Sequence, residues 1–232
     1  MARKPRFNLP GIPQHIIQRG NNREPCFFTE QDYLFYLDHL RKAAEKMACV
    51  IHAYVLMTNH VHLLATPLRE HAVSEMMQSL GRRYVRYINY VYRRTGTLWE
   101  GRYKANLVDS ECYVLTCYRY IELNPVRAGM TESAGEYRWS SYRTTALGES
   151  DDLITPHEEY LRLGGDAASR RHAYRELFRY HMDDKALHDI RQALNQEQIF
   201  GGERFKDQVD LMVSRRVRPG KSGRPRLDGG RE

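Results

Sequence analysis

The chain has 232 residues, which suits one sizeable domain with an appendage or two small domains. Its 36 Lys and Arg residues outnumber 29 Asp and Glu, and the resulting net charge of +7, together with 16 tyrosines, favours a polyanionic partner whose bases stack on exposed rings. Its four cysteines lack Cys-x-x-Cys spacing, and no stretch is apolar enough for a secretory signal or a membrane span. The composition therefore argues against a zinc knuckle, a redox pair or a membrane protein, and fits the cytoplasm.

A strand, a loop and a helix open the predicted order of elements. Residues 12–19 have the pattern of a first strand, and residues 20–25 are rich in turn formers and predict a loop whose polar side chains could grip a phosphate chain. Residues 29–32 are a plausible helix start. Apolar residues at three- and four-residue steps then predict an amphipathic helix to about residue 48.

Two histidines lie at the start of a predicted strand. The segment 49–65 is apolar and β-branched on both sides of a short polar break at residues 57–59, which indicates two strands joined by a turn. Because side chains alternate along a strand, His60 and His62 project from one face while Val61 points into the other layer. The pair is a candidate set of metal ligands. The alternative is two ordinary hydrogen-bonding histidines on a half-exposed sheet, since so short a pattern recurs by chance.

A second amphipathic helix is predicted over residues 72–94. Its apolar stripe leaves a group of arginines on the remaining surface, among them Arg82, Arg83 and Arg86. These charges are interleaved with tyrosines, which favours a nucleic-acid contact; a solvated charged face is the alternative.

A fourth short strand at residues 103–108 completes the order βαββαβ. This order predicts an α+β, ferredoxin-like fold, in which an antiparallel four-stranded sheet carries both helices on one face. In the usual strand order 4-1-3-2 the third strand is interior, so the two histidines lie on the face that those helices leave open. We expect an added helix, capped by Asp109 or Ser110 and ending near Asn124 before Pro125, to cover that face.

Tyr120 and Asn124 lie four residues apart on this added helix, so both can face the sheet. A tyrosine beside a metal that binds a phosphate oxygen is suited to phosphoryl transfer, because the cation polarises phosphorus and stabilises the developing charge. The alternative for Tyr120 is a core aromatic residue of an amphipathic helix.

The remainder of the chain predicts a helical extension and a tail. Residues 146–152 suggest a surface connection, and Thr155-Pro156-His157-Glu158 fits a capping box; helices to about residue 180 and shorter ones beyond predict a mostly helical extension over 146–213. We expect the extension to pack on the preceding domain, with a helix-turn-helix as the alternative. The basic tail, 214–232, is predicted to be disordered when free and to act as a DNA clamp or autoinhibitory arm. Its Gly223-Arg224-Pro225 resembles the core of an AT-hook.

Three ordered motifs resemble a known family. They are Arg19-Gly20-Asn21-Asn22-Arg23, Met57-Thr58-Asn59-His60-Val61-His62-Leu63-Leu64 and Tyr120-Ile121-Glu122-Leu123-Asn124-Pro125-Val126-Arg127-Ala128-Gly129, and Trp139-Ser140-Ser141-Tyr142 also matches. Over residues 8–145 the chain resembles the REP-associated tyrosine transposases, relatives of the single-tyrosine, HUH-type insertion-sequence transposases. The resemblance implies a catalytic domain over residues 1–145.

The resemblance also implies a site. His60 and His62 match the HUH metal ligands, Asn124 stands where relatives place a third polar ligand, and Tyr120 matches the nucleophile. In this family the tyrosine attacks a phosphodiester of single-stranded DNA, leaving a 5′-phosphotyrosyl link and a free 3′-hydroxyl, and a second attack rejoins strands. No small-molecule cofactor is required. Two imidazoles and an amide oxygen suit Mn²⁺ somewhat better than Mg²⁺, and either ion is expected to serve.

The substrate that the resemblance implies is a short DNA hairpin of the repetitive extragenic palindrome (REP) class, which predicts a bacterial protein associated with the nucleoid. Either a monomer or a homodimer is compatible with the family. The candidate DNA contacts are Arg19, Asn21, Arg23, Arg82, Arg83, Arg86, Lys104 and Arg224.

Two other functions remain open: a domesticated hairpin-binding protein that does not cut, and a hydrolytic metalloenzyme using His60 and His62. The intact His, His, Tyr and Asn positions favour cleavage over binding alone. The metalloenzyme lacks an evident third strong ligand and a general base.

Overall fold

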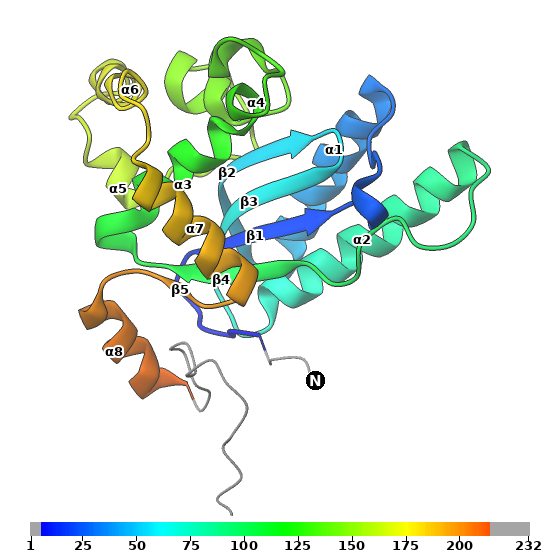
Figure 1. Cartoon of the computed structure of the whole chain (residues 1–232), viewed down its shortest axis with the longest axis horizontal. Helices are drawn as coiled ribbons and strands as arrows, with labels where there is room; N and C mark the ends of the chain where they lie inside the picture. Colours follow the sequence, from blue (N-terminus) through cyan, green and yellow to red (C-terminus); the bar gives the residue numbers. More distant parts are fainter. Residues whose placement is uncertain (1–5, 214–232) are drawn as a thin grey trace, which may run out of the picture.

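A computed structural model describes residues 6–213 of the chain, so the basic tail and the predicted contact Arg224 lie outside the described residues. Five strands form one sheet in the order β2-β3-β1-β4-β5 (Figure 1). Their bounds are Gln14–Arg19 (β1), Cys49–Met57 (β2), His60–Pro67 (β3), Lys104–Val108 (β4) and Ile199–Phe200 (β5). The first four strands are antiparallel and confirm the predicted order 4-1-3-2. The short β5 was not predicted; it pairs in parallel with β4.

Two long helices, α1 (Glu30–Met47) and α2 (Ala72–Val91), cover one face of the sheet. Thr29 and Asp32 cap α1 reciprocally, since Asp32 accepts the Thr29 backbone N–H at 2.9 Å, and this explains why the helix begins there. The inward side chains of alternate strand residues, such as Ile16, Val61 and Leu63, pack against these helices in an apolar core.

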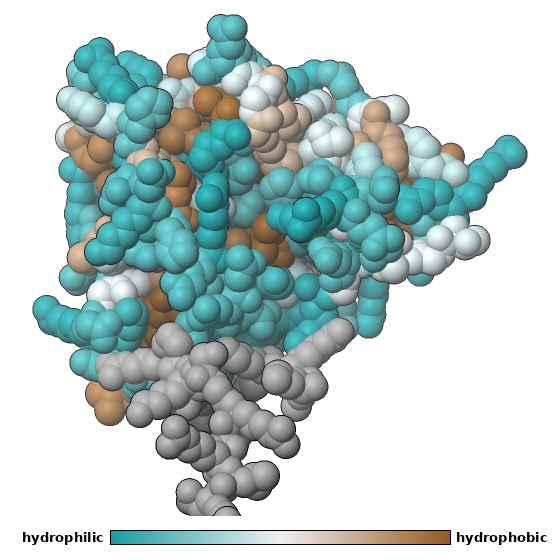
Figure 2. Space-filling view, viewed as in Figure 1, coloured by the Kyte–Doolittle hydropathy of each residue, from teal (hydrophilic) through white to brown (hydrophobic). Residues whose placement is uncertain are grey.

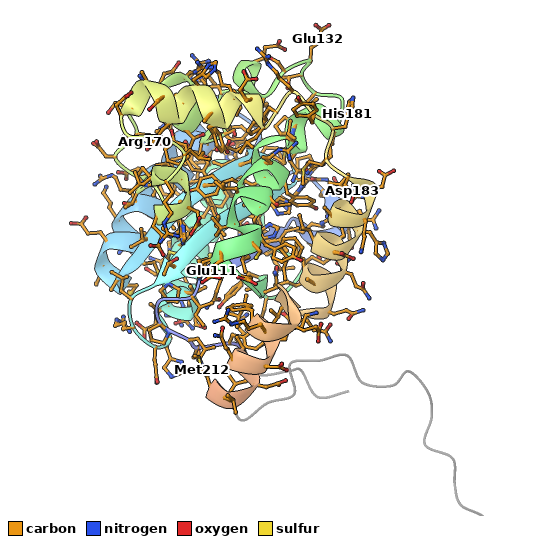
Figure 3. All side chains as sticks on the ribbon, turned by 90° about the vertical axis from the view of Figure 1, so that its left-hand side faces the viewer. Glu111, Glu132, Arg170, His181, Asp183 and Met212 are labelled. Atoms are coloured by element: carbon orange, nitrogen blue, oxygen red, sulfur yellow. The ribbon has the colours of Figure 1, made fainter. Side chains whose placement is uncertain are left out.

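Helix α3 (Ser110–Glu122) covers the opposite face, as expected. Figure 3 shows the layers from the side, with α1 and α3 on opposite sides of the sheet. Helix α3 ends at Glu122, close to the predicted end near Asn124, and a short helix that was not predicted, α4 (Asn124–Arg127), follows. Leu123 joins the two helices with right-handed helical dihedrals, and Pro125, which lacks an N–H, is tolerated in the first turn of α4.

The region after residue 145 is mostly helical, with α5 at Glu158–Leu161, α6 at Ala167–Glu176, α7 at Asp184–Gln196 and α8 at Glu203–Met212. Helix α7 lies on the same side of the sheet as α3 and contacts β1, β4 and α3 (Figure 1). Between α7 and α8 the chain forms β5 rather than a tight turn, so these two helices are not a helix-turn-helix.

The predicted capping box at residues 155–158 is wrong in its position. Helix α5 is capped by His157, whose ring nitrogen accepts the Glu159 N–H at 3.2 Å. Thr155 is engaged elsewhere, because its N–H donates to the Ile51 carbonyl and its own carbonyl accepts from His52. Within residues 6–213, no helix is both long and apolar enough to span a bilayer.

Candidate active site

His60 and His62 project from β3 toward α3, as the alternation of the strand predicts. Their ring centroids are 5.1 Å apart, and His62 is only 2% exposed because β3 is interior and its neighbours β2 and β1 flank it. The strand therefore delivers two adjacent imidazoles to the covered face of the sheet.

The turn before His60 is held by the loop after β1. This loop includes the short 3-10 helix η1 (Asn21–Arg23), and the Gly20 N–H donates to the Asn59 carbonyl at 2.8 Å. A Cβ on Gly20 would lie 2.2 Å from the Glu24 carbonyl oxygen, so only glycine fits there. The position of His60 thus depends on a segment about forty residues earlier in the chain.

Asn59 determines which nitrogen of His60 carries the proton. Its amide nitrogen donates to the Arg23 carbonyl at 2.9 Å, so its oxygen must face His60 Nδ1, at 2.6 Å. An amide oxygen only accepts, so His60 Nδ1 bears the hydrogen and Nε2 keeps a lone pair. Burial, with a smaller effect from Arg19, lowers the pKa of His60 to about 4, so the ring is neutral at pH 7.

His62 has a different partner. Its Nδ1 lies 2.8 Å from Nε2 of His15, a fully buried residue of β1 that the sequence analysis did not single out. Burial, followed by the neighbouring charges of His15, His60, Arg127 and Arg19, lowers the pKa of His62 well below its usual value. A neutral imidazole is the form that binds a metal ion.

Tyr120 projects from α3 onto these rings. Its ring centroid lies 5.7 Å from that of His62 and 5.5 Å from that of His15, both edge-on. The Arg127 guanidinium lies 4.4 Å from the centre of the Tyr120 ring and donates to the Tyr120 carbonyl at 2.6 Å. Burial lowers the pKa of Arg127 to about 10, which leaves it charged at neutral pH beside the tyrosine.

Asn124 completes the group at the start of α4. Its side-chain nitrogen is buried and has no hydrogen-bond partner, so this N–H group is free to donate to a bound ligand. Among the described residues, no cluster of three His, Cys, Asp or Glu side chains could hold a metal ion. The side chains here that could hold a divalent cation are the two imidazoles, whose Nδ1 atoms are already hydrogen-bonded, and Asn124 through its amide oxygen.

One cavity of about 620 Å³ is lined by four of these side chains: His60, His62, Tyr120 and Asn124. The cations that share its lining are Arg19, Arg23, Arg102, Lys104 and Arg191, against the single acid Glu100. Helix α7 supplies one wall through Arg191, Leu194 and Asn195, and the face that carries α7 is mostly hydrophilic (Figure 2). This charge balance suits a phosphodiester chain.

The predicted DNA contacts fall into two places. Arg19, Arg23 and Lys104 line the cavity, and Asn21 lies beside it on η1. By contrast, Arg82, Arg83 and Arg86 line a separate groove of about 890 Å³ on the outer side of α1 and α2, across the sheet. There they accompany Phe35 and Tyr87, whose rings stack at 3.9 Å.

The residues that sequence reasoning missed are His15, Arg127, Arg102, Arg191 and Asn195. His15 had a usable signal, since it shares the alternation of β1 with Ile17 and Arg19 and must face the same layer. Arg191 and Asn195 had no such signal, because only the fold of the extension brings α7 over the sheet.

Comparisons with known proteins bear on the family and the fold of the chain. The family model described as "Transposase IS200 like" matches residues 9–124. Among solved structures, a REP-associated tyrosine transposase bound to a REP hairpin has a TM-score of 0.55 at 15% identity, covering 68% of this chain and 99% of that one. A candidate transposase from Deinococcus radiodurans has 24% identity and a TM-score of 0.37, covering 52% and 96%. A comparison with curated proteins finds no match. The likeness to the REP-associated tyrosine transposase establishes a shared fold.

Proposed function

This chain belongs to the family of IS200-like transposases, and we therefore propose that it cleaves and rejoins single-stranded DNA through a covalent bond to Tyr120. The observation that carries the proposal is the contact of the Tyr120 ring with His62 inside a cationic cavity that also holds His60 and Asn124. A purely structural tyrosine would have no need of two neutral imidazoles and an unpartnered amide around it.

The reaction is a pair of transesterifications. Tyr120 Oη attacks the scissile phosphorus; the new bond joins Oη to phosphorus, and the bond from phosphorus to the 3′-oxygen breaks. The phenol gives up its proton to solvent and the departing 3′-oxygen takes one up to become a hydroxyl, so no net proton is consumed, and the 5′ end of the downstream strand stays on the protein. A 3′-hydroxyl of DNA then attacks the phosphotyrosine and releases Tyr120. Each step exchanges one phosphodiester for another, so no nucleotide cofactor is consumed.

The residues around Tyr120 orient its side chain and bind the DNA backbone. Arg127 stacks over the tyrosine ring and holds the carbonyl of the same residue, which fixes the end of α3 and places a positive charge beside the phenol as it becomes negative. The cavity cations Arg19, Arg23, Lys104 and Arg191 neutralise the phosphates of the entering strand.

His60, His62 and Asn124 would hold a divalent cation, Mg²⁺ or Mn²⁺. When bound, such an ion acts as a Lewis acid on a phosphate oxygen and stabilises the charge that develops during displacement. The tautomer of His60 supports this assignment, because Asn59 leaves its Nε2 lone pair free for a ligand.

We propose as substrate a DNA hairpin of the REP class with a single-stranded flank, since the similar solved protein was bound to a REP hairpin. The flank would enter the cavity, with Asn21 at its rim. The outer groove with Arg82, Arg83 and Arg86 would hold backbone of the hairpin, and Arg224 of the tail would add a further contact.

The test uses hairpin oligonucleotides with a single-stranded flank, labelled 3′ of the expected cut, incubated with the protein and Mn²⁺ or Mg²⁺ and separated on a denaturing gel. We expect a labelled protein band that requires metal and is lost in Tyr120→Phe and in His60→Ala. The matched control is Tyr113→Phe, since Tyr113 lies on the same helix but packs edge-on against Phe200 away from this cavity. Tight hairpin binding without adduct or cleavage, across several repeat sequences, would replace the proposal with the binding-only alternative.

A further inference from the structure

His15 is a buried histidine in contact with two candidate catalytic side chains. It lies on β1 with no exposed surface, its Nε2 is 2.8 Å from His62 Nδ1, and its ring edge meets Tyr120 at 5.5 Å between centroids. An apolar side chain could fill this place without burying polar atoms, so packing alone does not explain a histidine here.

The hydrogen bond between His15 and His62 can be made in two ways. If His62 donates from Nδ1, its Nε2 keeps a lone pair that is available to a ligand. If His15 donates from Nε2, then His62 must carry its own proton on Nε2, where no lone pair remains. His60 has no such freedom, because its partner is an amide oxygen that only accepts.

The tautomer of His62 therefore depends on whether His15 carries its own proton on Nδ1 or on Nε2. His15 Nδ1 is buried without a hydrogen-bond partner, and so is Oδ1 of Asn106. These residues are directly opposite each other in the β1–β4 pair, and Asn106 is 1% exposed. An amide oxygen accepts but never donates, so a hydrogen bond to it, direct or through one water, requires a proton on His15 Nδ1.

We propose that Asn106 and His15 are positioning residues that hold His62 in the tautomer with its proton on Nδ1. Asn106 Oδ1 would accept from His15 Nδ1, and His15 Nε2 would then accept from His62 Nδ1. His62 Nε2 remains unprotonated and available to a cation. The consequence for metal binding rests on the proposed function; the tautomer does not, and it can be measured in the protein without metal or DNA.

The first measurement is the tautomer of His62, read from the side-chain nitrogen shifts of the metal-free full chain labelled with ¹⁵N-histidine. The wild type is expected to show the proton on Nδ1, and His15→Leu, which removes the acceptor, is expected to lose that preference. His15→Gln keeps an oxygen acceptor in the same place and should retain it. A wild-type His62 with its proton on Nε2 would overturn the proposal, whether or not any variant folds.

The second measurement is Mn²⁺ binding without DNA, followed by the electron paramagnetic resonance signal of the free ion. Loss of a residue that orients a metal ligand typically weakens affinity by about 10- to 100-fold, and this is expected for His15→Leu, with a smaller loss for Asn106→Leu and near-normal binding for His15→Gln. The control is His52→Leu, a buried histidine on β2 whose partners are Thr66 and Thr155, and it should bind Mn²⁺ like the wild type.

The outcomes separate this inference from the proposed function. A wild type that forms no DNA adduct but shows the His15-dependent tautomer removes the cleavage proposal and keeps the positioning role. Adduct formation by the wild type, with folded His15→Leu retaining both the tautomer and the Mn²⁺ affinity, removes the positioning role and keeps cleavage.

Discussion

The two faces of the sheet bury different chemistry. Toward α1 and α2 the strands present aliphatic side chains such as Ile16, Val61 and Leu63, and these meet a nearly continuous apolar core. Toward α3 the intervening residues of the same strands include His15 and His62, which lie beneath Tyr120. The period-two alternation of a strand thus lets one segment stabilise the fold with one set of residues and carry reactive groups with the other.

This contrast has an energetic consequence. Apolar burial on the α1 and α2 side requires no specific hydrogen-bond geometry, whereas each buried polar group on the α3 side needs its own hydrogen bond. We therefore expect changes on the first face to act on stability alone and changes on the second to act on cleavage as well.

Leu63 and Leu64 give the largest and sharpest test, because they are adjacent, fully buried and on opposite faces. Truncation of either to alanine is expected to lower the free energy of unfolding by about 2–5 kcal/mol. Leu64 stands opposite His15 in the sheet, so only Leu64→Ala should also slow adduct formation per folded molecule. Urea unfolding and adduct assays on folded protein measure the two effects; equal activity in both variants would contradict the division between the faces.

Glu122 tests the polar face through pH. It is fully buried and accepts hydrogen bonds from Ser141, Thr145 and Tyr174, yet burial prevails and raises its pKa to about 7. The folded state then binds the proton more tightly than the unfolded state, so this contribution to stability is complete below about pH 4.5 and is lost as pH rises through 7, up to about 3 kcal/mol in all.

Glu122→Gln stays neutral and should remove that loss. We expect the free energy of unfolding of Glu122→Gln, minus that of the wild type, to be larger at pH 8 than at pH 5, as measured by urea unfolding at both pH values. Parallel pH dependence of the two proteins would show that the carboxyl does not titrate as the burial implies.

Gly20 tests the support of His60. Gly20→Ala places a Cβ against the Glu24 carbonyl, so the loop that holds the Asn59 turn must move. We expect a loss of about 1–3 kcal/mol and a tenfold or greater fall in adduct formation. The control is Gly81→Ala in α2, where a Cβ meets nothing within 4 Å; it should stabilise by about 0.5–1 kcal/mol without altering cleavage.

Two arginines give the smallest expected effects. Arg191→Ala in the cavity and Arg86→Ala in the outer groove should each lower the slope of log affinity against log salt by about 1 for a hairpin with its flank. With a single-stranded oligonucleotide that lacks the stem, only Arg191→Ala should weaken binding. A weakened Arg86→Ala on that substrate would place the strand in the groove instead of the cavity.

The sequence predicted the arrangement of the candidate site correctly where its residues lie close together along the chain and follow the regular spacing of a strand or a helix. Alternation placed His60 and His62 on one face, and four-residue spacing brought Tyr120 and Asn124 to the same cavity. The strand order also followed from the βαββαβ pattern.

The features that sequence reasoning missed depend on long-range register. His15 meets His62 across 47 positions only because β1 pairs with β3 in one particular alignment. Strand β5 has two residues and therefore no period to detect, and α7 is an ordinary amphipathic helix whose place over the cavity is set by tertiary packing. The tautomer of His60 likewise depends on the Arg23 carbonyl, which no local pattern connects to Asn59.

The wall supplied by α7 has a consequence for protein synthesis. The strands and helices that carry His60, His62 and Tyr120 emerge from the ribosome well before Arg191, Leu194 and β5. A nascent chain can therefore assemble its four main strands while β4 still has an unpaired edge and the cavity is open on one side. A product terminated before residue 184 would present the reactive tyrosine without this wall and with a strand edge free to pair with other chains, so premature termination would yield an aggregation-prone species rather than a smaller enzyme.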